Sequence, residues 1–131
     1  MSKNHPEYAL QKLVCGYLNS QFPKVLYYSD TIAAVSLTPM QGKRNKAIQK
    51  HGFKVPDILV LKPNGKYYAL FLELKIETPF KKNGEIKASK DDHLKGQQET
   101  INQLNGLNYF ACFCWTFDQA KQIIDDYMKL M

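Results

Sequence analysis

The stretch GFKVPDILVLKPNGKYYALFLELK, residues 52–75, decides how this chain folds. Apolar runs lie on either side of the turn-forming residues PNG at positions 63–65, which predicts two antiparallel β-strands joined by a tight turn. Three charged residues interrupt or adjoin these runs: Asp57, Glu73 and Lys75. Charged side chains are rarely buried unless they are paired or bind a metal. Glu73 and Lys75 stand two positions apart in a strand, so they project to the same face of the sheet.

The length of the turn decides whether Asp57 joins them. A two-residue turn would place Asp57 and Glu73 on opposite faces of the sheet. A three-residue loop over 63–65 would pair Lys62 with Lys66 and place both carboxylates on one face. Proline at the first position of the loop and glycine in the left-handed position favour this longer loop. We therefore predict that the two carboxylates and the lysine converge.

Two carboxylates that converge repel each other and need a cation between them. The expected ion is Mg²⁺ or Mn²⁺, because both ligands are hard oxygen donors and no histidine or cysteine cluster lies nearby in the sequence. A metal held by Asp57 and Glu73 would lower the pKa of a coordinated water and polarise a phosphodiester. Lys75 would orient or deprotonate that water and stabilise the developing charge. The alternative is a carboxylate–lysine pair that only holds the hairpin together, which is a weak source of stability.

The composition indicates one domain, residues 1–131, that is large enough for a hydrophobic core. No apolar run reaches membrane-spanning length and the N-terminus lacks an apolar signal segment, so we expect no membrane association and a cytoplasmic location. The three cysteines have no C-x-x-C spacing and lie in apolar surroundings, so we expect reduced core thiols.

The net charge of +6 is unevenly distributed along the chain. Between Asp30 and Asp57 there is no acidic residue, and all five basic residues that we expect to bind DNA fall there: Lys43, Arg44, Lys46, Lys50 and Lys54. A basic block beside a carboxylate cluster is typical of proteins that bind a phosphate backbone. The alternative is an ordinary solvated surface.

Hydrophobic periodicity and turn signals predict the remaining elements. We expect helices over 4–22, 94–105 and from Thr116 onward, strands over 24–29 and 108–115, and a short basic helix or ordered loop over 43–51. Residues 31–42 resist assignment, and residues 77–96 form a polar insertion that is either a flap beside the site or a tolerated loop. This order predicts an α/β fold, with a mixed central sheet flanked by helices on both faces.

The sequence VPD at 55–57 followed by ELK at 73–75 resembles the PD-(D/E)xK nuclease signature. Four more motifs follow the order found in one subfamily: GKRN at 42–45, GQ-x3-I-x2-L at 96–104, NYFA at 108–111 and FD-x-A-x2-II-x2-Y at 117–127. Together they make nearly the whole chain similar to the VRR-NUC (virus-type replication-repair nuclease) subfamily. The chain departs from the subfamily at 77–96, where a short turn is expected.

This resemblance implies a restriction-endonuclease-like core whose metal ligands are the side chains of Asp57 and Glu73 and the backbone carbonyl of Leu74. Lys75 is the implied catalytic lysine. From the residues alone, Glu7 is better explained as a first-turn carboxylate that complements the helix dipole. It matches the subfamily's first-helix glutamate, however, and the resemblance therefore implies a supporting metal role. Gln97 matches a glutamine near the active site, although the adjoining Gln98 leaves its register open.

The resemblance also implies a partner and an assembly. Small members of the subfamily resemble phage or bacterial proteins that act as homodimers on branched DNA. The leading expectation is therefore a metal-dependent deoxyribonuclease with the selectivity of a Holliday-junction resolvase. The alternatives are a non-catalytic nucleic-acid-binding module on the same fold, or a nuclease that acts on flaps, DNA ends or RNA.

Overall fold

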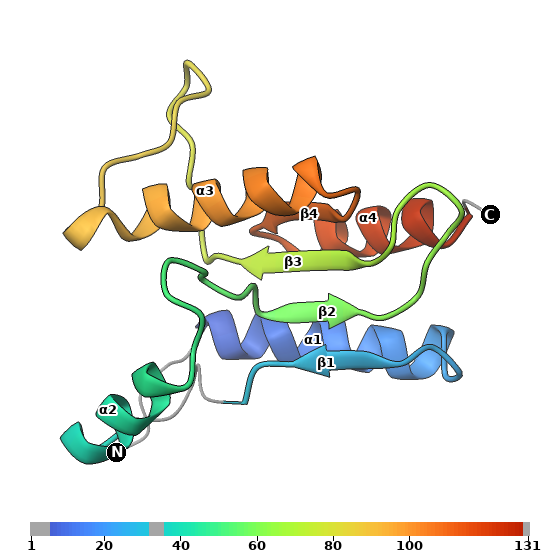
Figure 1. Ribbon diagram of the computed structural model, residues 1–131. Helices are drawn as coiled ribbons and strands as arrows, with labels where there is room; N and C mark the ends of the chain where they lie inside the picture. The colour runs from blue at the N-terminus through green and yellow to red at the C-terminus, as the bar shows by residue number, and fades with distance from the viewer. Residues whose placement is uncertain (1–5, 32–35, 130–131) are drawn as a thin grey trace.

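The computed structural model describes residues 6–31 and 36–129, where a four-stranded mixed sheet carries helices on both faces (Figure 1). The strands are ordered β1-β2-β3-β4; the first two pairings are antiparallel, whereas β3 and β4 are parallel. The elements are α1 (Pro6–Gln21), β1 (Tyr27–Ser29), α2 (Pro39–Ala47), β2 (Ile58–Val60), β3 (Leu70–Leu74), η1 (Lys90–Asp92), α3 (His93–Gly106), β4 (Phe110–Cys114) and α4 (Phe117–Lys129). The predicted α/β class and mixed sheet are confirmed.

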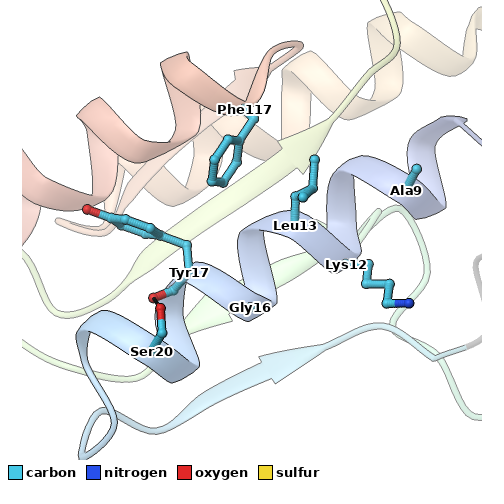
Figure 2. A pocket seen from close by; sticks show the side chains of 7 residues that line it. All are labelled: Ala9, Lys12, Leu13, Gly16, Tyr17, Ser20 and Phe117. Carbon is cyan, nitrogen blue, oxygen red and sulfur yellow. Dashed lines mark hydrogen bonds between the residues drawn. The ribbon is translucent and has the colours of Figure 1, made fainter.

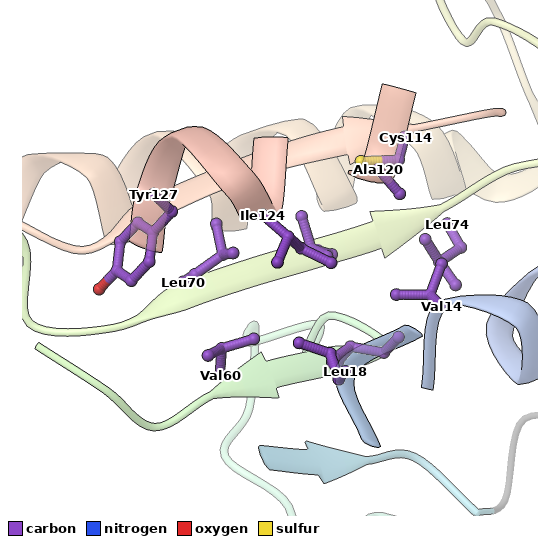
Figure 3. Close-up of a cluster of buried hydrophobic side chains, with 11 residues drawn as sticks. Val14, Leu18, Val60, Leu70, Leu74, Cys114, Ala120, Ile124 and Tyr127 are labelled. Carbon is purple, nitrogen blue, oxygen red and sulfur yellow. The ribbon is translucent and has the colours of Figure 1, made fainter. Parts of the chain in front are cut away.

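One face of the sheet packs against α1 and α4 (Figure 3). All five residues of β3 are buried, so the strand is covered on both faces of the sheet, and its alternate residues Leu70, Leu72 and Leu74 point to this face. The side chains that meet them from the helices are Val14 and Leu18 of α1 and Ala120, Ile124 and Tyr127 of α4. This cluster fixes α1 across the sheet, and the first turn of α1 carries Glu7.

The opposite face packs against α3. Phe71 of β3 and Phe113 of β4 lie here with Ile101 and Leu104, which are spaced one helical turn apart. Glu73 has the same strand parity as Phe71, so it points to this side of the sheet although it is a carboxylate. A buried acid in an otherwise apolar layer marks this end of the sheet as chemically distinct.

The connection between β2 and β3 differs from the predicted three-residue loop. The register pairs Ile58 with Leu72, two residues away from the register that would pair Lys62 with Lys66. The reason is Asn64, which is 2% exposed and organises a wider loop with its side chain. Its Oδ1 accepts hydrogen bonds from the N–H groups of Lys66 and Tyr67, and its Nδ2 donates to the carbonyl of Tyr127 in α4.

Other sequence predictions hold with shifted limits. β1 is shorter than the predicted strand over 24–29, and the predicted helix start at residue 4 lies outside the described residues, as do residues 32–35 of the unassigned stretch. That stretch contains a start signal the prediction missed: Thr38 and Gln41 form a capping box at the N-terminus of α2. At α4, Gln119 N donates to Thr116 Oγ1, but Gln119 Oε1 accepts from Trp115 N, so the predicted box is only half formed.

The predicted insertion folds into a small hairpin, residues 79–87, which we call the arm (the yellow segment that projects from the body in Figure 1). Phe80 and Ile86 form an antiparallel bridge, and Lys87 N donates to the carbonyl of Pro79 at 2.8 Å. Phe80 anchors the arm, because its ring contacts Phe113 and Trp115 edge-on with centroids 5.6 and 6.2 Å apart.

A hollow of about 680 Å³ lies between α1 and α4 (Figure 2). Leu13, Tyr17 and Phe117 line it, and Leu13 is 54% exposed. Leu13 therefore borders this hollow and does not lie in the buried core. The lining holds no carboxylate and none of the predicted site residues.

Two further expectations can be compared with the structure. Cys15, Cys112 and Cys114 are free thiols, as predicted, and Cys114 is fully buried. In the part of the chain that the structure describes, no helix is both long and apolar enough to span a membrane.

Candidate active site

Asp57 and Glu73 meet at the end of the sheet where β2 begins and β3 finishes (Figure 1). Continuing the strand register by one residue places Asp57 directly opposite Glu73. The two carboxyl groups share a hydrogen bond, and Asp57 Oδ2 also accepts one of 2.7 Å from Leu74 N. The predicted convergence is confirmed despite the shifted register, because a shift of two residues leaves every side chain on its own face.

The environment strongly disfavours the charged form of Glu73. The residue is 4% exposed, and this burial, the charge of Asp57 and the hydrogen bond to Asp57 raise its pKa from 4.5 to about 10. Lys75 acts in the opposite direction. Without a metal, the pair therefore holds a proton at neutral pH. A divalent cation between the carboxylates would take the place of that proton.

Without divalent metal, we expect the protein to lose stability as the pH rises from about 5 towards 10. Folding raises the pKa of Glu73, so between 4.5 and about 10 the folded state binds more protons than the unfolded chain. The free energy of unfolding then falls with rising pH. Thermal unfolding in EDTA at several pH values measures this slope, and Glu73→Gln, which cannot titrate, should flatten it. Parallel curves for the two proteins would contradict the expectation.

Lys75 and Glu7 lie beside this pair. The pKa of Glu7 is raised, chiefly by partial burial. The charge of Lys75 lowers it, and the charge of Asp57 raises it. Glu7 and Lys75 also line the same cavity. Four predicted catalytic residues thus come together from α1, the residue before β2, and the end of β3, although they are spread over more than half of the chain.

Gln97 is the fifth predicted catalytic residue and lies on the buried side of α3. It is 7% exposed, and its Oε1 has no hydrogen-bond partner. Because α3 runs back along the sheet from the end of β3, Gln97 lies towards the catalytic end (Figure 1). A buried oxygen without a donor costs about 1–3 kcal/mol, so such an atom suits a donor brought by substrate or water. The neighbouring Gln98 instead donates to Asn102 on the exposed side, which favours Gln97 for the predicted role.

The predicted DNA-binding residues fall into two places. Lys43, Arg44 and Lys46 are exposed on α2, none of whose residues is buried. Lys54 lies apart from them: its side chain packs over Gly96 of α3, and its N–H donates to Thr100 Oγ1 at 3.1 Å. Lys50 is exposed in the segment between the two. In Figure 1, α2 and the arm both extend from the catalytic end of the sheet.

Sequence reasoning missed Lys87 and His93, which line the cavity beside Lys75. Partial burial and the charges of Lys75 and Lys54 lower the pKa of His93. No spacing rule links either residue to Lys75, because the arm and η1 bring them back after an irregular stretch. A polar insertion directly after a candidate catalytic lysine was the available signal.

The residues present fit Mg²⁺ or Mn²⁺ in a particular way. Among residues 6–31 and 36–129, no three Asp, Glu, His or Cys side chains form a group that could hold a metal by themselves. Mg²⁺, however, is commonly bound by one or two carboxylates, with water and substrate phosphates completing its shell. Two adjacent carboxylates that share a proton supply that donor set. Ligation by Leu74 and Glu7 stays a prediction.

No family model matches the sequence, and no curated protein matches it. A solved structure described as a "VRR_NUC domain protein" is similar, with a TM-score of 0.61 and 22% sequence identity over 98% of this chain and 93% of that chain. The protein therefore has the nuclease-type fold of a VRR_NUC domain protein. This is the fold that the sequence resemblance implied.

Proposed function

We propose that the protein is a divalent-metal-dependent deoxyribonuclease that hydrolyses phosphodiester bonds. One observation carries the proposal: Asp57 and Glu73 lie opposite each other and are hydrogen-bonded, Glu73 is buried, and Lys75 lies beside them. A protein that only needed a stable hairpin would gain more from an apolar residue than from an acid of raised pKa at position 73. The energetic cost of burying this acid is explained if the site holds a cation.

In the proposed mechanism, Asp57 and Glu73 would hold Mg²⁺ or Mn²⁺, and the bound ion would supply Lewis-acid polarisation of the phosphate and an acidified water. The backbone N–H of Leu74 fixes the orientation of Asp57 through its hydrogen bond. Lys75 contributes a positive charge at the reacting phosphate and orients the attacking water. Glu7 and Gln97 border the same region, where Glu7 supports the metal and the free oxygen of Gln97 accepts a hydrogen bond from water or substrate.

The proposed substrate is DNA, preferably branched, bound through exposed basic side chains. Lys43, Arg44 and Lys46 on α2 are suited to phosphate contacts, which give affinity without sequence preference. The proposed active form is a homodimer, because a two-fold axis places one active site on each of two strands, as symmetric junction cleavage requires. A cytoplasmic location in a bacterial or phage-infected cell agrees with this role.

The test is cleavage of labelled four-way junction, flap, single-stranded and linear duplex DNA, and of RNA, in Mg²⁺, Mn²⁺ or EDTA. We expect cutting in either metal, none in EDTA, and the highest rate on the four-way junction. A preference for flaps or ends would keep the nuclease and change its substrate. Binding without cutting in both metals would leave the non-catalytic nucleic-acid-binding module as the better account.

A further inference from the structure

A cavity of about 240 Å³ opens beside Lys75, between the end of β3, the base of the arm and the start of α3. Its polar lining is mixed: Glu7, Lys75, Glu77, Thr78, Lys87 and His93. The arm shapes this cavity, because the hydrogen bond from Lys87 N to the carbonyl of Pro79 closes its base. The base of the arm therefore forms one wall of the cavity, and Lys75 lies on another.

The donors on its wall suit a small anion. Lys87 offers an ammonium group, and His93 offers a ring nitrogen. Thr78 Oγ1 accepts a hydrogen bond from Phe80 N at 3.2 Å, which leaves its hydroxyl proton to be donated elsewhere. Of the two carboxylates on the wall, Glu7 faces Asp57 and Lys75 and thus belongs to the metal side, while Glu77 is exposed.

The volume of the cavity limits the kind of anion that it can bind. Pockets for drug-sized ligands are typically about 300–1,000 Å³, so this cavity is small for a nucleoside and suits a single phosphate group. Consecutive phosphates of a nucleic-acid strand are neighbours. A strand whose scissile phosphate lies at Lys75 would therefore bring another phosphate to this cavity.

We propose that the cavity binds a phosphate group next to the scissile phosphate on the same nucleic-acid strand, and that Lys87, His93 and Thr78 hold it. The proposal rests on the proposed function, because it takes nucleic acid as the source of the phosphate. The proposal gives the insertion a role, because Lys87 at the base of the arm would position the substrate strand. Lys87 then matters for substrate binding, and the catalytic carboxylates are not involved.

The first experiment measures DNA binding by fluorescence anisotropy in EDTA, where no metal-dependent cutting takes place. Lys87→Gln should weaken binding about tenfold and reduce the slope of log affinity against log salt by about one, as expected for one lost phosphate contact. Lys24→Gln, which removes the same charge from an exposed site after α1, should change affinity less than about twofold. Lys87→Arg should keep most of the binding.

The second experiment uses inorganic phosphate as the probe and does not depend on DNA. Phosphate should shift the NMR signals of the His93 ring, while those of His51, which is also exposed but does not line the cavity, stay unchanged. The shift should disappear in Lys87→Gln, provided that its melting temperature matches that of the wild-type protein. Equal DNA binding by the Lys87→Gln and Lys24→Gln variants, or equal shifts of both histidines, would overturn the proposal.

Oligonucleotides with and without a 5′-terminal phosphate distinguish the two sources of the group. If Lys87 matters equally for both, the cavity takes a backbone phosphodiester; if it matters only for phosphorylated strands, it takes a terminal monophosphate. Failure of the nuclease function is distinguishable. Lys87-dependent binding without cutting in Mg²⁺ or Mn²⁺ would leave the phosphate site intact, whereas cutting with no role for Lys87 would leave only the nuclease.

Discussion

Glu73→Gln is expected to abolish metal-dependent cleavage while the protein stays folded. A metal contributes several kcal/mol of transition-state stabilisation, and each 1.36 kcal/mol is tenfold in rate, so the loss should be roughly a thousandfold or more. Glutamine has the shape of glutamate and removes the charge that burial and Asp57 disfavour. Unfolding at neutral pH in EDTA should therefore show equal or higher stability. Single-turnover cleavage and thermal unfolding of the same preparation measure the two effects.

The matched control for this variant is Glu99→Gln, which makes the same change on an exposed position of α3. It should leave cleavage and stability close to those of the wild-type protein. Full activity in Glu73→Gln would remove this residue from the metal site and with it the proposed mechanism. A large loss of stability would instead show that Glu73 is mainly a structural partner of Asp57.

Asn64→Ala is expected to lower the free energy of unfolding by about 2–4 kcal/mol. The substitution leaves the part-buried N–H groups of Lys66 and Tyr67 and the buried carbonyl of Tyr127 without their partner, and a buried group left unpaired costs about 1–3 kcal/mol. The costs do not add fully, because the loop can relax and admit water. Urea unfolding followed by circular dichroism measures the change.

Asn83→Ala provides the control, because Asn83 makes a similar local bond to Glu85 N but is exposed in the arm. Its loss should cost less than about 1 kcal/mol, since water replaces the bond. A similar cost at both positions would show that the 61–69 loop does not depend on its buried asparagine. The two variants therefore compare one kind of turn in a buried and in an exposed setting.

The sequence was sufficient to predict the meeting of Asp57 and Glu73, and the reason is parity. Whether two residues of paired strands share a face depends only on whether the register shifts by an odd or an even number of residues. The loop residues favoured the correct parity. The register itself was wrong by two residues. Asn64 decides it through contacts with α4, and turn propensities do not include such long-range contacts.

The surroundings of the pair were less predictable. In the sequence, Phe80 belongs to the predicted polar insertion. In the structure, its ring anchors the arm against Phe113 and Trp115. Lys87 and His93 reach the site only because that anchor turns the chain back. One aromatic residue in a polar segment is a weak signal, and its partners come from a strand that follows much later in the chain. Side-chain packing between distant segments thus sets what a local pattern leaves open.

The two ends of the arm lie side by side, joined by the bond from Lys87 N to the Pro79 carbonyl. A segment whose ends already touch can be exchanged for a longer or shorter one with little change in closure entropy, which grows only slowly with loop length. The arm, which follows β3 and its Glu73, is therefore a segment that can be replaced by one of another length. Related chains could diversify the substrates they accept by changing this segment while the carboxylates and the sheet beneath them stay the same.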